Sequence, residues 1–207
     1  MQYDFNQIKF FDTVNDLIKL PVQSIYEVAV VGRSNAGKSS MINAITNQNK
    51  LAFTSKTPGR TQFINYFSFI EEGRFLVDLP GYGYAKVPQK IRDHWVELLG
   101  QYLQTRDQLV GLILIMDSRH PLKDLDLQMI NFLRPTKKPI HLVLSKADKL
   151  THQEKMKTLA RVKQQVSAMG SDINYTVQLF STPKRLGIIE VQDMIRVWLM
   201  QTNIAKT

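Results

Sequence analysis

Apolar, β-branched runs alternate along the chain with segments whose apolar residues recur at helical spacing. Six strands are predicted, at residues 26–31, 62–70, 74–78, 109–117, 140–144 and 175–179. Glu-Glu-Gly joins the second strand to the third, and this short connection predicts an antiparallel hairpin. Helices are predicted after the first strand to about residue 47, from Pro88, at 122–133, after Thr151 and around 191–198.

The helix after Thr151 opens with a capping-box pattern completed by Glu154. Its apolar positions predict a buried stripe made of Met156, Leu159, Val162 and Val166. Lys157 and Arg161 are expected to point away from that stripe.

The alternation of strands and helices predicts an α/β fold, with a mostly parallel six-stranded sheet, one antiparallel edge strand and helices on both faces. A length of 207 residues suits a single domain. We expect that domain at residues 25–202, an N-terminal extension at 1–24 packed on it, and a short tail at 203–207. Ligands of such sheets bind at the carboxyl ends of the strands. Every motif described below falls at one of those ends.

Composition narrows the functional classes. The chain has no cysteine, which excludes disulfides, thiolate metal sites and cysteine nucleophiles. The longest apolar run, residues 109–116, is too short to span a bilayer, and the N-terminus lacks the features of a secretory signal. We therefore expect a cytoplasmic protein without a stable membrane anchor. A net charge of +9 favours nucleic acid or an acidic membrane face as partner, and a generally basic solvated surface is the alternative.

The segment GRSNAGKSS directly follows the first strand and fits the phosphate-loop pattern G-x-x-x-x-G-K-[ST]. Gly32 and Gly37 let successive backbone N–H groups converge on a phosphate at a helix N-terminus. Lys38 is expected to reach the β- and γ-phosphates, and the Ser39 hydroxyl to bind Mg²⁺. An ordinary Gly/Ser/Asn loop before a helix is the alternative, and the pattern by itself does not identify the base.

A switch motif, Asp-Leu-Pro-Gly at residues 78–81, ends the third strand. Asp78 can hold the hydration shell of Mg²⁺, and the Gly81 N–H can sense a γ-phosphate. Between the two motifs lies TPGRTQ, in which Thr61 is the candidate for a second magnesium-binding hydroxyl. Thr57 is its rival, and a plain strand threonine after a Pro-Gly turn is the remaining alternative.

The strand at residues 140–144 leads into Ser-Lys-Ala-Asp. Asp148 can accept hydrogen bonds from guanine N1–H and the exocyclic amine, a pair that adenine does not offer, and the stem of Lys146 can lie over the base. After the last strand, Ser181 and backbone amides could meet the guanine carbonyl. The order and register of the motifs predict guanine specificity, whereas the four residues alone would also fit an exposed charge pair at a strand end.

Taken together, GRSNAGKSS, TPGRTQFINYF, DLPGYGYA and SKADKL resemble the EngB family, also called YihA or YsxC, over about residues 22–200. The resemblance implies a Ras-like P-loop GTPase fold, magnesium dependence, and a role in large (50S) ribosomal subunit assembly and in normal cell division and septation. It implies that Ser39 and Thr61 bind magnesium, with Asp78 acting through water, and that Lys38, Thr61 and Gly81 are catalytic. The implied nucleotide contacts are Gly32, Arg33, Ser34, Asn35, Ala36, Gly37, Lys38, Ser39, Gly59, Arg60, Thr61, Gln62, Phe63, Asp78, Leu79, Pro80, Gly81, Ser145, Lys146, Ala147, Asp148, Phe180, Ser181 and Thr182.

Three positions bear on turnover and affinity. Tyr82 stands where many GTPases keep a water-orienting glutamine, so we expect slow intrinsic hydrolysis that a partner stimulates. Asn35 suggests that K⁺ supplies positive charge near the phosphates; equal hydrolysis rates in sodium and potassium buffers would contradict this, and a purely structural asparagine is the alternative. Ser145 replaces the usual Asn or Thr, which predicts a weaker link to the phosphate loop and modest nucleotide affinity.

The expected partners are GTP and GDP and the RNA and proteins of the large ribosomal subunit, and the expected state is a monomer. Candidate RNA phosphate contacts are the basic pairs Lys157 and Arg161, Lys137 and Lys138, and Lys184 and Arg185. One rival is a metabolic P-loop kinase or ATPase, which would leave Asp148 without a purpose. The other rival is a regulatory switch with a non-ribosomal protein or membrane-surface partner. We interpret the four histidines as structural or surface residues.

Overall fold

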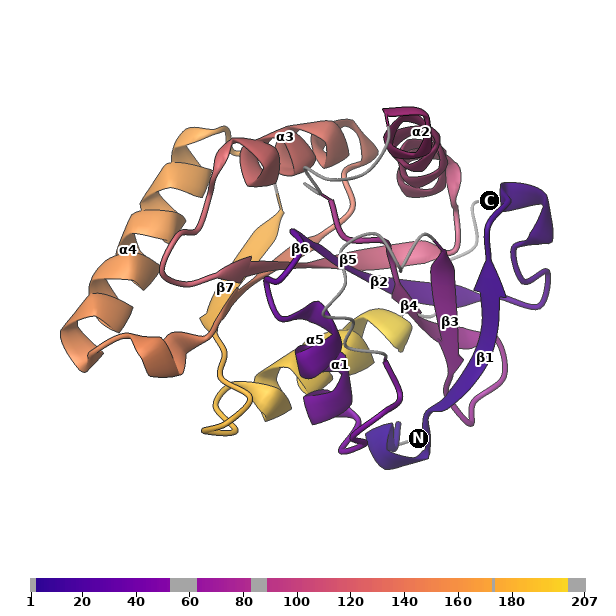
Figure 1. Cartoon of the computed structure of the whole chain (residues 1–207), viewed down its shortest axis with the longest axis horizontal. Coiled ribbons are helices and arrows are strands. Elements are labelled where there is room, and N and C mark those ends of the chain that lie inside the picture. Colours follow the sequence, from indigo (N-terminus) through magenta and orange to yellow (C-terminus); the bar gives the residue numbers. More distant parts are fainter. Residues whose placement is uncertain (1–2, 53–62, 83–88, 173, 201–207) are drawn as a thin grey trace.

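The computed structural model describes residues 3–52, 63–82, 89–172 and 174–200. Within these ranges, seven strands form one sheet in the order β1-β3-β4-β2-β5-β6-β7 (Figure 1). They are β1 (Lys9–Val14), β2 (Tyr26–Gly32), β3 (Ile64–Ser68), β4 (Arg74–Asp78), β5 (Leu109–Asp117), β6 (Ile140–Ser145) and β7 (Tyr175–Leu179). Strand β3 is antiparallel to its neighbours β1 and β4, and all other neighbouring strands are parallel.

The predicted α/β fold with a mostly parallel sheet is confirmed, and the sheet has seven strands instead of the six expected. The additional strand is β1, which pairs with β3 and forms an edge of the sheet. Its first five residues are exposed, and a bulge between Phe10 and Asp12 interrupts its pairing. This strand therefore lacks the regular apolar alternation by which half-buried strands are recognised.

The part of the chain that the structure describes also contains five α-helices and four short 3₁₀ helices. The α-helices are α1 (Lys38–Ile45), α2 (Gln89–Thr105), α3 (Asp124–Leu133), α4 (His152–Ala168) and α5 (Ile188–Leu199). The 3₁₀ helices are η1 (Phe5–Gln7), η2 (Leu17–Lys19), η3 (Arg134–Thr136) and η4 (Ala147–Lys149). None of the helices within the described ranges has the length and hydropathy needed to cross a bilayer.

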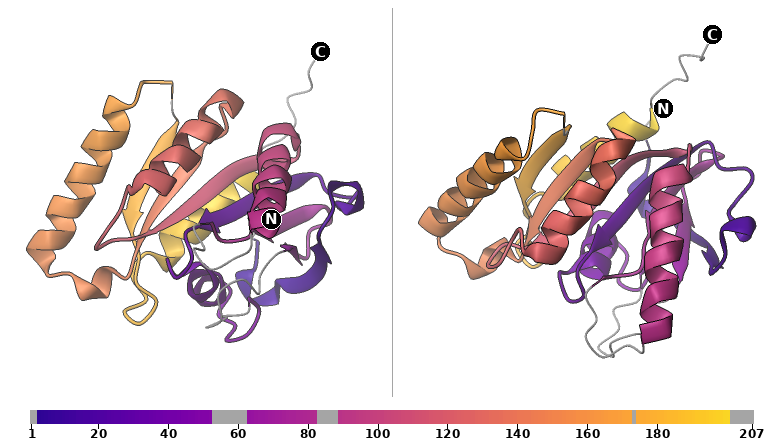
Figure 2. Two further views of the ribbon diagram at one scale, coloured as in Figure 1. Left: turned by 45° about the horizontal axis from the view of Figure 1, so that its top comes forward. Right: turned by 90° about the horizontal axis from the view of Figure 1, so that it is seen from above.

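The helices cover both faces of the sheet (Figures 1 and 2). Helices α2, α3 and α4 pack on one face, and α1 and α5 pack on the other together with the N-terminal segment. Strand β5, at the centre, serves both cores: Leu112 and Leu114 contribute to the first, and Ile113 and Ile115 to the second. Because side chains alternate across a strand, a strand buried on both faces must be apolar at every position.

Helix α4 bears out most of its predicted pattern. Thr151 and Glu154 form the expected capping box, with a 2.7 Å bond from the Thr151 N–H to the Glu154 carboxylate. Val162 and Val166 are buried, but Met156 is half exposed, so its predicted burial is wrong. At 100° per residue, Met156 lies on the flank of the stripe that those two valines define.

Candidate functional site

The phosphate loop (residues 32–39) leaves the carboxyl end of β2 and enters α1. A Cβ at Gly32 would lie 2.4 Å from the Ile115 side chain, so only glycine lets β2 end this close to β5. Gly37 directly precedes α1 and has a φ of 100°, a conformation that favours glycine. Asn35 has a φ of 62°, in the left-handed region that asparagine tolerates. The backbone thus takes the strand–loop–helix course that the motif predicted.

The switch segment (residues 78–82) lies beside the phosphate loop, because β4 pairs in parallel with β2. The Lys38 ammonium donates a hydrogen bond to the buried Asp78 carboxylate. The pairing with β2 continues beyond Asp78, because the Leu79 N–H donates to Val30 O at 3.0 Å. The structure therefore brings together the lysine predicted to bind phosphate and the aspartate predicted to act on magnesium.

The oxygens at this point suit Mg²⁺. The ion prefers one or two protein oxygens supplemented by phosphate oxygens and water, over a cage made wholly of protein ligands. Asp78 offers a carboxylate at the end of β4, and Ser39 offers a hydroxyl in the first turn of α1. Among the described residues, no group of three or more His, Cys, Asp or Glu is arranged so that it could hold a metal ion by itself. The donor set fits a magnesium ion held jointly with a nucleotide.

The guanine motif (residues 145–148) follows β6 and contacts the phosphate loop at two points. The Ser145 hydroxyl donates to Ala36 O at 2.5 Å and lies 3.0 Å from Met116 O. The Lys146 ammonium donates to Asn35 O at 2.6 Å. The loss of the amide at Ser145 therefore leaves a direct bond to the phosphate loop in place.

Asp117, which the sequence analysis missed, also holds Lys146. Its carboxylate lies 3.0 Å from the Lys146 ammonium and accepts bonds of 2.9 and 2.6 Å from Arg119. Burial alone would raise the pKa of Asp117, but the bonds from Arg119 and Lys146 outweigh it and hold that pKa well below its usual range. Asp117 ends β5 in register with Ser145, a proximity that depends on strand order and is invisible in the sequence.

Asp148, the predicted guanine reader, is held by the loop after β7. The Ser181 hydroxyl donates to its carboxylate at 2.7 Å, and Lys149 lies 3.6 Å away. The bond from Ser181 lowers the pKa of Asp148, so the carboxylate stays ionised and can accept hydrogen bonds. The two segments predicted to contact guanine are thus joined to each other.

Among the other predicted contacts, Ser34 is partly buried, Pro80 is buried and Thr182 is exposed. Gly59, Arg60, Thr61 and Gln62, with the rival Thr57, lie outside the described residues, while Phe63 is described and exposed. The side chains of Ala36, Leu79, Ala147 and Phe180 are in the core, which leaves only backbone atoms for a ligand. The Arg33 guanidinium donates to Asp126 at 3.0 Å and to His120 O at 3.0 Å, and is thereby committed to α3 and the loop before it.

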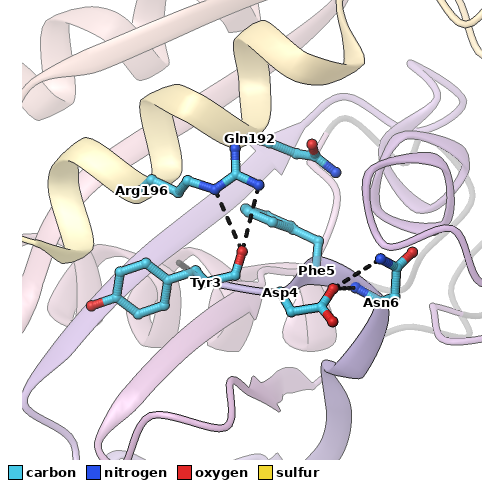
Figure 3. Close-up of a pocket in the computed structure, with 6 residues that line it drawn as sticks. All are labelled: Tyr3, Asp4, Phe5, Asn6, Gln192 and Arg196. Atoms are coloured by element: carbon cyan, nitrogen blue, oxygen red, sulfur yellow. Dashed lines mark hydrogen bonds between the residues drawn. The ribbon is translucent and has the colours of Figure 1, made fainter. Parts of the chain in front are cut away.

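A pocket of about 360 Å³ lies elsewhere, between the N-terminal segment and α5 (Figure 3). It is lined by Tyr3, Asp4, Phe5, Asn6, Gln192 and Arg196. Its polar groups already bond to one another: Asp4 accepts from Asn6, and Arg196 reaches Tyr3 O at 3.4 Å (Figure 3). No residue of the predicted nucleotide site lines this pocket.

Comparisons with known proteins decide the family. A family model described as "50S ribosome-binding GTPase" matches residues 27–146. The probable GTP-binding protein EngB of Neisseria meningitidis serogroup B is 55% identical over 201 residues, which cover 97% of this chain and 95% of the relative. The chain belongs to the EngB family. An EngB protein of Laribacter hongkongensis is 54% identical over 195 residues, covering 94% of this chain and 86% of that relative. As an EngB GTPase, the protein binds GTP and hydrolyses it.

Solved structures agree on the fold. The crystal structure of a probable GTP-binding protein EngB superimposes with a TM-score of 0.66 at 19% identity, covering 84% of this chain and 98% of that chain. Era, solved with MgGDPNP and nucleotides 1506–1542 of 16S ribosomal RNA, gives a TM-score of 0.67 at 20% identity, with 89% of this chain and 60% of Era covered. At these identities the likeness shows a common P-loop GTPase fold.

Proposed function

We propose that this EngB GTPase is a GTP-gated factor in assembly of the large (50S) ribosomal subunit, and that normal cell division and septation depend on it. The observation that carries the proposal is the match of residues 27–146 to a family described as 50S ribosome-binding GTPases. The protein would act in the cytoplasm as a monomer, with slow intrinsic hydrolysis that the ribosomal partner stimulates.

The proposed nucleotide site uses the residues that the strand ends bring together. Backbone N–H groups of the phosphate loop and Lys38 would bind the phosphates, and Asp148, Lys146 and Ser181 would hold the guanine. When bound, Mg²⁺ would neutralise charge on the phosphate oxygens; Ser39 and Asp78 are the described residues that would hold it, together with Thr61. The Gly81 N–H would sense the γ-phosphate.

The distribution of charge supports a polyanionic partner. Residues 134–185 contain 11 Lys and Arg against 3 Asp and Glu, a net charge of +8 out of +9 for the whole chain. This stretch runs through β6, α4 and β7, at the edge of the sheet opposite β1 (Figure 1). A concentration of positive charge on one side of a molecule attracts an RNA backbone.

Exposure sorts the basic residues proposed to contact RNA. Lys157, Arg161, Lys184 and Arg185 are exposed, as is Lys137. Lys138 is different, because its ammonium donates to the carbonyls of Arg106 and Leu109 at 3.1 and 3.0 Å. We therefore remove Lys138 from the proposed RNA contacts.

Co-sedimentation with purified ribosomal subunits tests the proposal. The protein is incubated with 50S or 30S subunits in the presence of GDP, GTP or a non-hydrolysable GTP analogue, at about 50 mM and about 200 mM salt. We expect it to pellet with 50S subunits selectively in the triphosphate state, and less at the higher salt. The absence of pelleting with 50S subunits in any nucleotide state would remove the ribosomal role, and equal pelleting in every state would remove the gating by GTP. Flotation of the protein with acidic lipid vesicles, measured in a parallel experiment, would point instead to a membrane-surface partner.

A further inference from the structure

A fully buried carboxylate at the start of α3 connects three separate elements. Asp126 has no exposed surface, and its two oxygens accept different bonds. One oxygen accepts the Lys123 N–H at 3.0 Å, which caps the helix. The other accepts Arg33 Nε at 3.0 Å and the Tyr82 hydroxyl at 2.8 Å. The first bond is local to α3, whereas the other two reach the phosphate loop and the switch segment.

Tyr82 is also bonded to the phosphate loop through its backbone. Its N–H donates to Gly32 O at 3.2 Å, and its carbonyl accepts the Ser34 N–H at 3.0 Å. These bonds extend the parallel pairing of β2 and β4 beyond the strand ends, with Arg33 opposite Tyr82. The side chain and the backbone of Tyr82 therefore fix it to the same neighbour.

Gly81 lies between two anchored positions. On one side, Asp78 pairs with Lys38 of the phosphate loop. On the other side, Tyr82 is held by Asp126 and by the backbone of residues 32 and 34. Burial and the neighbouring carboxylate raise the pKa of Tyr82, so its hydroxyl keeps the proton that it donates. Gly81 itself is buried.

We propose that Asp126 is a positioning residue for triphosphate recognition, which fixes Gly81 beside the phosphate loop through the Tyr82 hydroxyl and Arg33. The inference rests on the proposed role of Gly81 as the γ-phosphate sensor. A backbone N–H that is already in place loses little conformational freedom when the γ-phosphate binds. The bonds from Tyr82 and Arg33 to Asp126, which we call the anchor, therefore favour binding of GTP over GDP. GDP lacks the group that Gly81 would contact and gains nothing from the anchor.

Helix capping alone does not explain why Asp126 is fully buried. A capping carboxylate needs one oxygen for the backbone, and such residues are normally at the surface, in contact with water. Asp126 is instead buried, and its second oxygen accepts bonds from Arg33 and Tyr82, which precede it in the chain by 93 and 44 positions. Tyr82, at the position where many GTPases have a catalytic glutamine, is here committed to holding the switch segment.

Tyr82→Phe tests the proposal, because it removes only the hydroxyl and leaves the ring. Affinities for GDP and for a non-hydrolysable GTP analogue are measured by titration of fluorescent nucleotides. We expect affinity for the GTP analogue to fall about ten-fold, the usual effect of losing a hydrogen bond to a charged group, while affinity for GDP stays within about two-fold. The ratio of the affinity for the GTP analogue to the affinity for GDP should therefore fall. Asp126→Asn, which weakens the hydrogen-bond acceptor, should lower the same ratio.

Tyr102→Phe is a matched control. The Tyr102 hydroxyl also donates to a buried carboxylate, that of Glu27, at 2.6 Å, but Glu27 lies at the opposite end of β2 from the phosphate loop. This variant should lose thermal stability and keep the wild-type ratio of the two affinities. A ratio unchanged in Tyr82→Phe, or lowered equally in Tyr102→Phe, would overturn the proposal.

Gly81→Pro, which removes the Gly81 N–H, distinguishes the role of Gly81 from that of Asp126. If Gly81→Pro lowers the ratio but Tyr82→Phe does not, Gly81 senses the phosphate without help from Asp126, and only the present inference is wrong. If neither variant changes the ratio, the proposed role of Gly81 is wrong and the inference falls with it.

Discussion

Ser145 illustrates how much of the site depends on single hydrogen bonds. The sequence predicted a weakened link to the phosphate loop, because serine lacks the amide that asparagine would provide. In the structure its hydroxyl donates to Ala36 O, and Lys146 adds a second bond to Asn35 O. Two residues of the guanine motif, Ser145 and Lys146, thus bond to the phosphate loop. Modest nucleotide affinity stays a prediction.

Asp148→Asn provides a test of base recognition at this scale. The amide replaces one acceptor by a donor, so we expect affinity for GTP to fall about 100-fold or more and affinity for xanthosine triphosphate to rise. Competition binding with the two nucleotides measures both. Asp172→Asn is the control, because Asp172 pairs with Arg134 on the surface and should leave base choice unchanged. Retention of guanine preference by Asp148→Asn would mean that Asp148 does not read the base.

At the scale of elements, β6 and β7 are joined by a partly buried polar contact as well as by the hydrogen bonds between the two strands. His141 is almost fully buried, and its ring nitrogens lie 2.6 Å from the Thr176 hydroxyl and 2.7 Å from the Gln178 carbonyl oxygen. Gln178 in turn donates to Gly187 O just before α5. The interpretation of the histidines as structural or surface residues fits His141, whose partners all lie in neighbouring elements.

His141 makes stability depend on pH in a predictable direction. Burial lowers its pKa below the value in the unfolded chain, only partly offset by Gln178, so the unfolded state binds more protons. Stability is therefore lost as pH falls from about 6.5 towards the folded pKa. In urea unfolding between about pH 7.5 and about pH 5, His141→Gln should flatten the dependence by up to about 1.4 kcal/mol per pH unit. Equal slopes for the two proteins would contradict this.

At the scale of the whole molecule, the two edges of the sheet differ in charge. Residues 134–185, which run through β6, α4 and β7, have a net charge of +8, whereas residues 3–24, which include the edge strand β1, have two Lys and three Asp and a net charge of −1. Lys157 and Arg161 lie four residues apart on the outer face of α4, away from Val162. This geometry lets both approach one RNA backbone.

Removing two charges from this face should weaken ribosome binding selectively. We expect Lys157→Gln with Arg161→Gln to reduce co-sedimentation with 50S subunits and to lower the slope of log affinity against log salt by about 1.5. The control is Lys9→Gln with Lys19→Gln, which removes the same charge from exposed positions near the opposite edge. If wild-type protein binds and both double variants bind equally, the docking face is elsewhere. The proposed function would then stand without it.

The sequence by itself determined the order and type of the main elements and the phosphate-loop, switch and guanine motifs. These are short-range features, since strand and helix periods and motif spacings extend over a few residues. Tertiary structure decided the edge strand β1, the support of Lys146 by Asp117, and the bonds of Arg33 and Tyr82 to Asp126. Such contacts join residues far apart in the chain, and they depend on the lateral order and register of strands, which leave no local trace in the sequence.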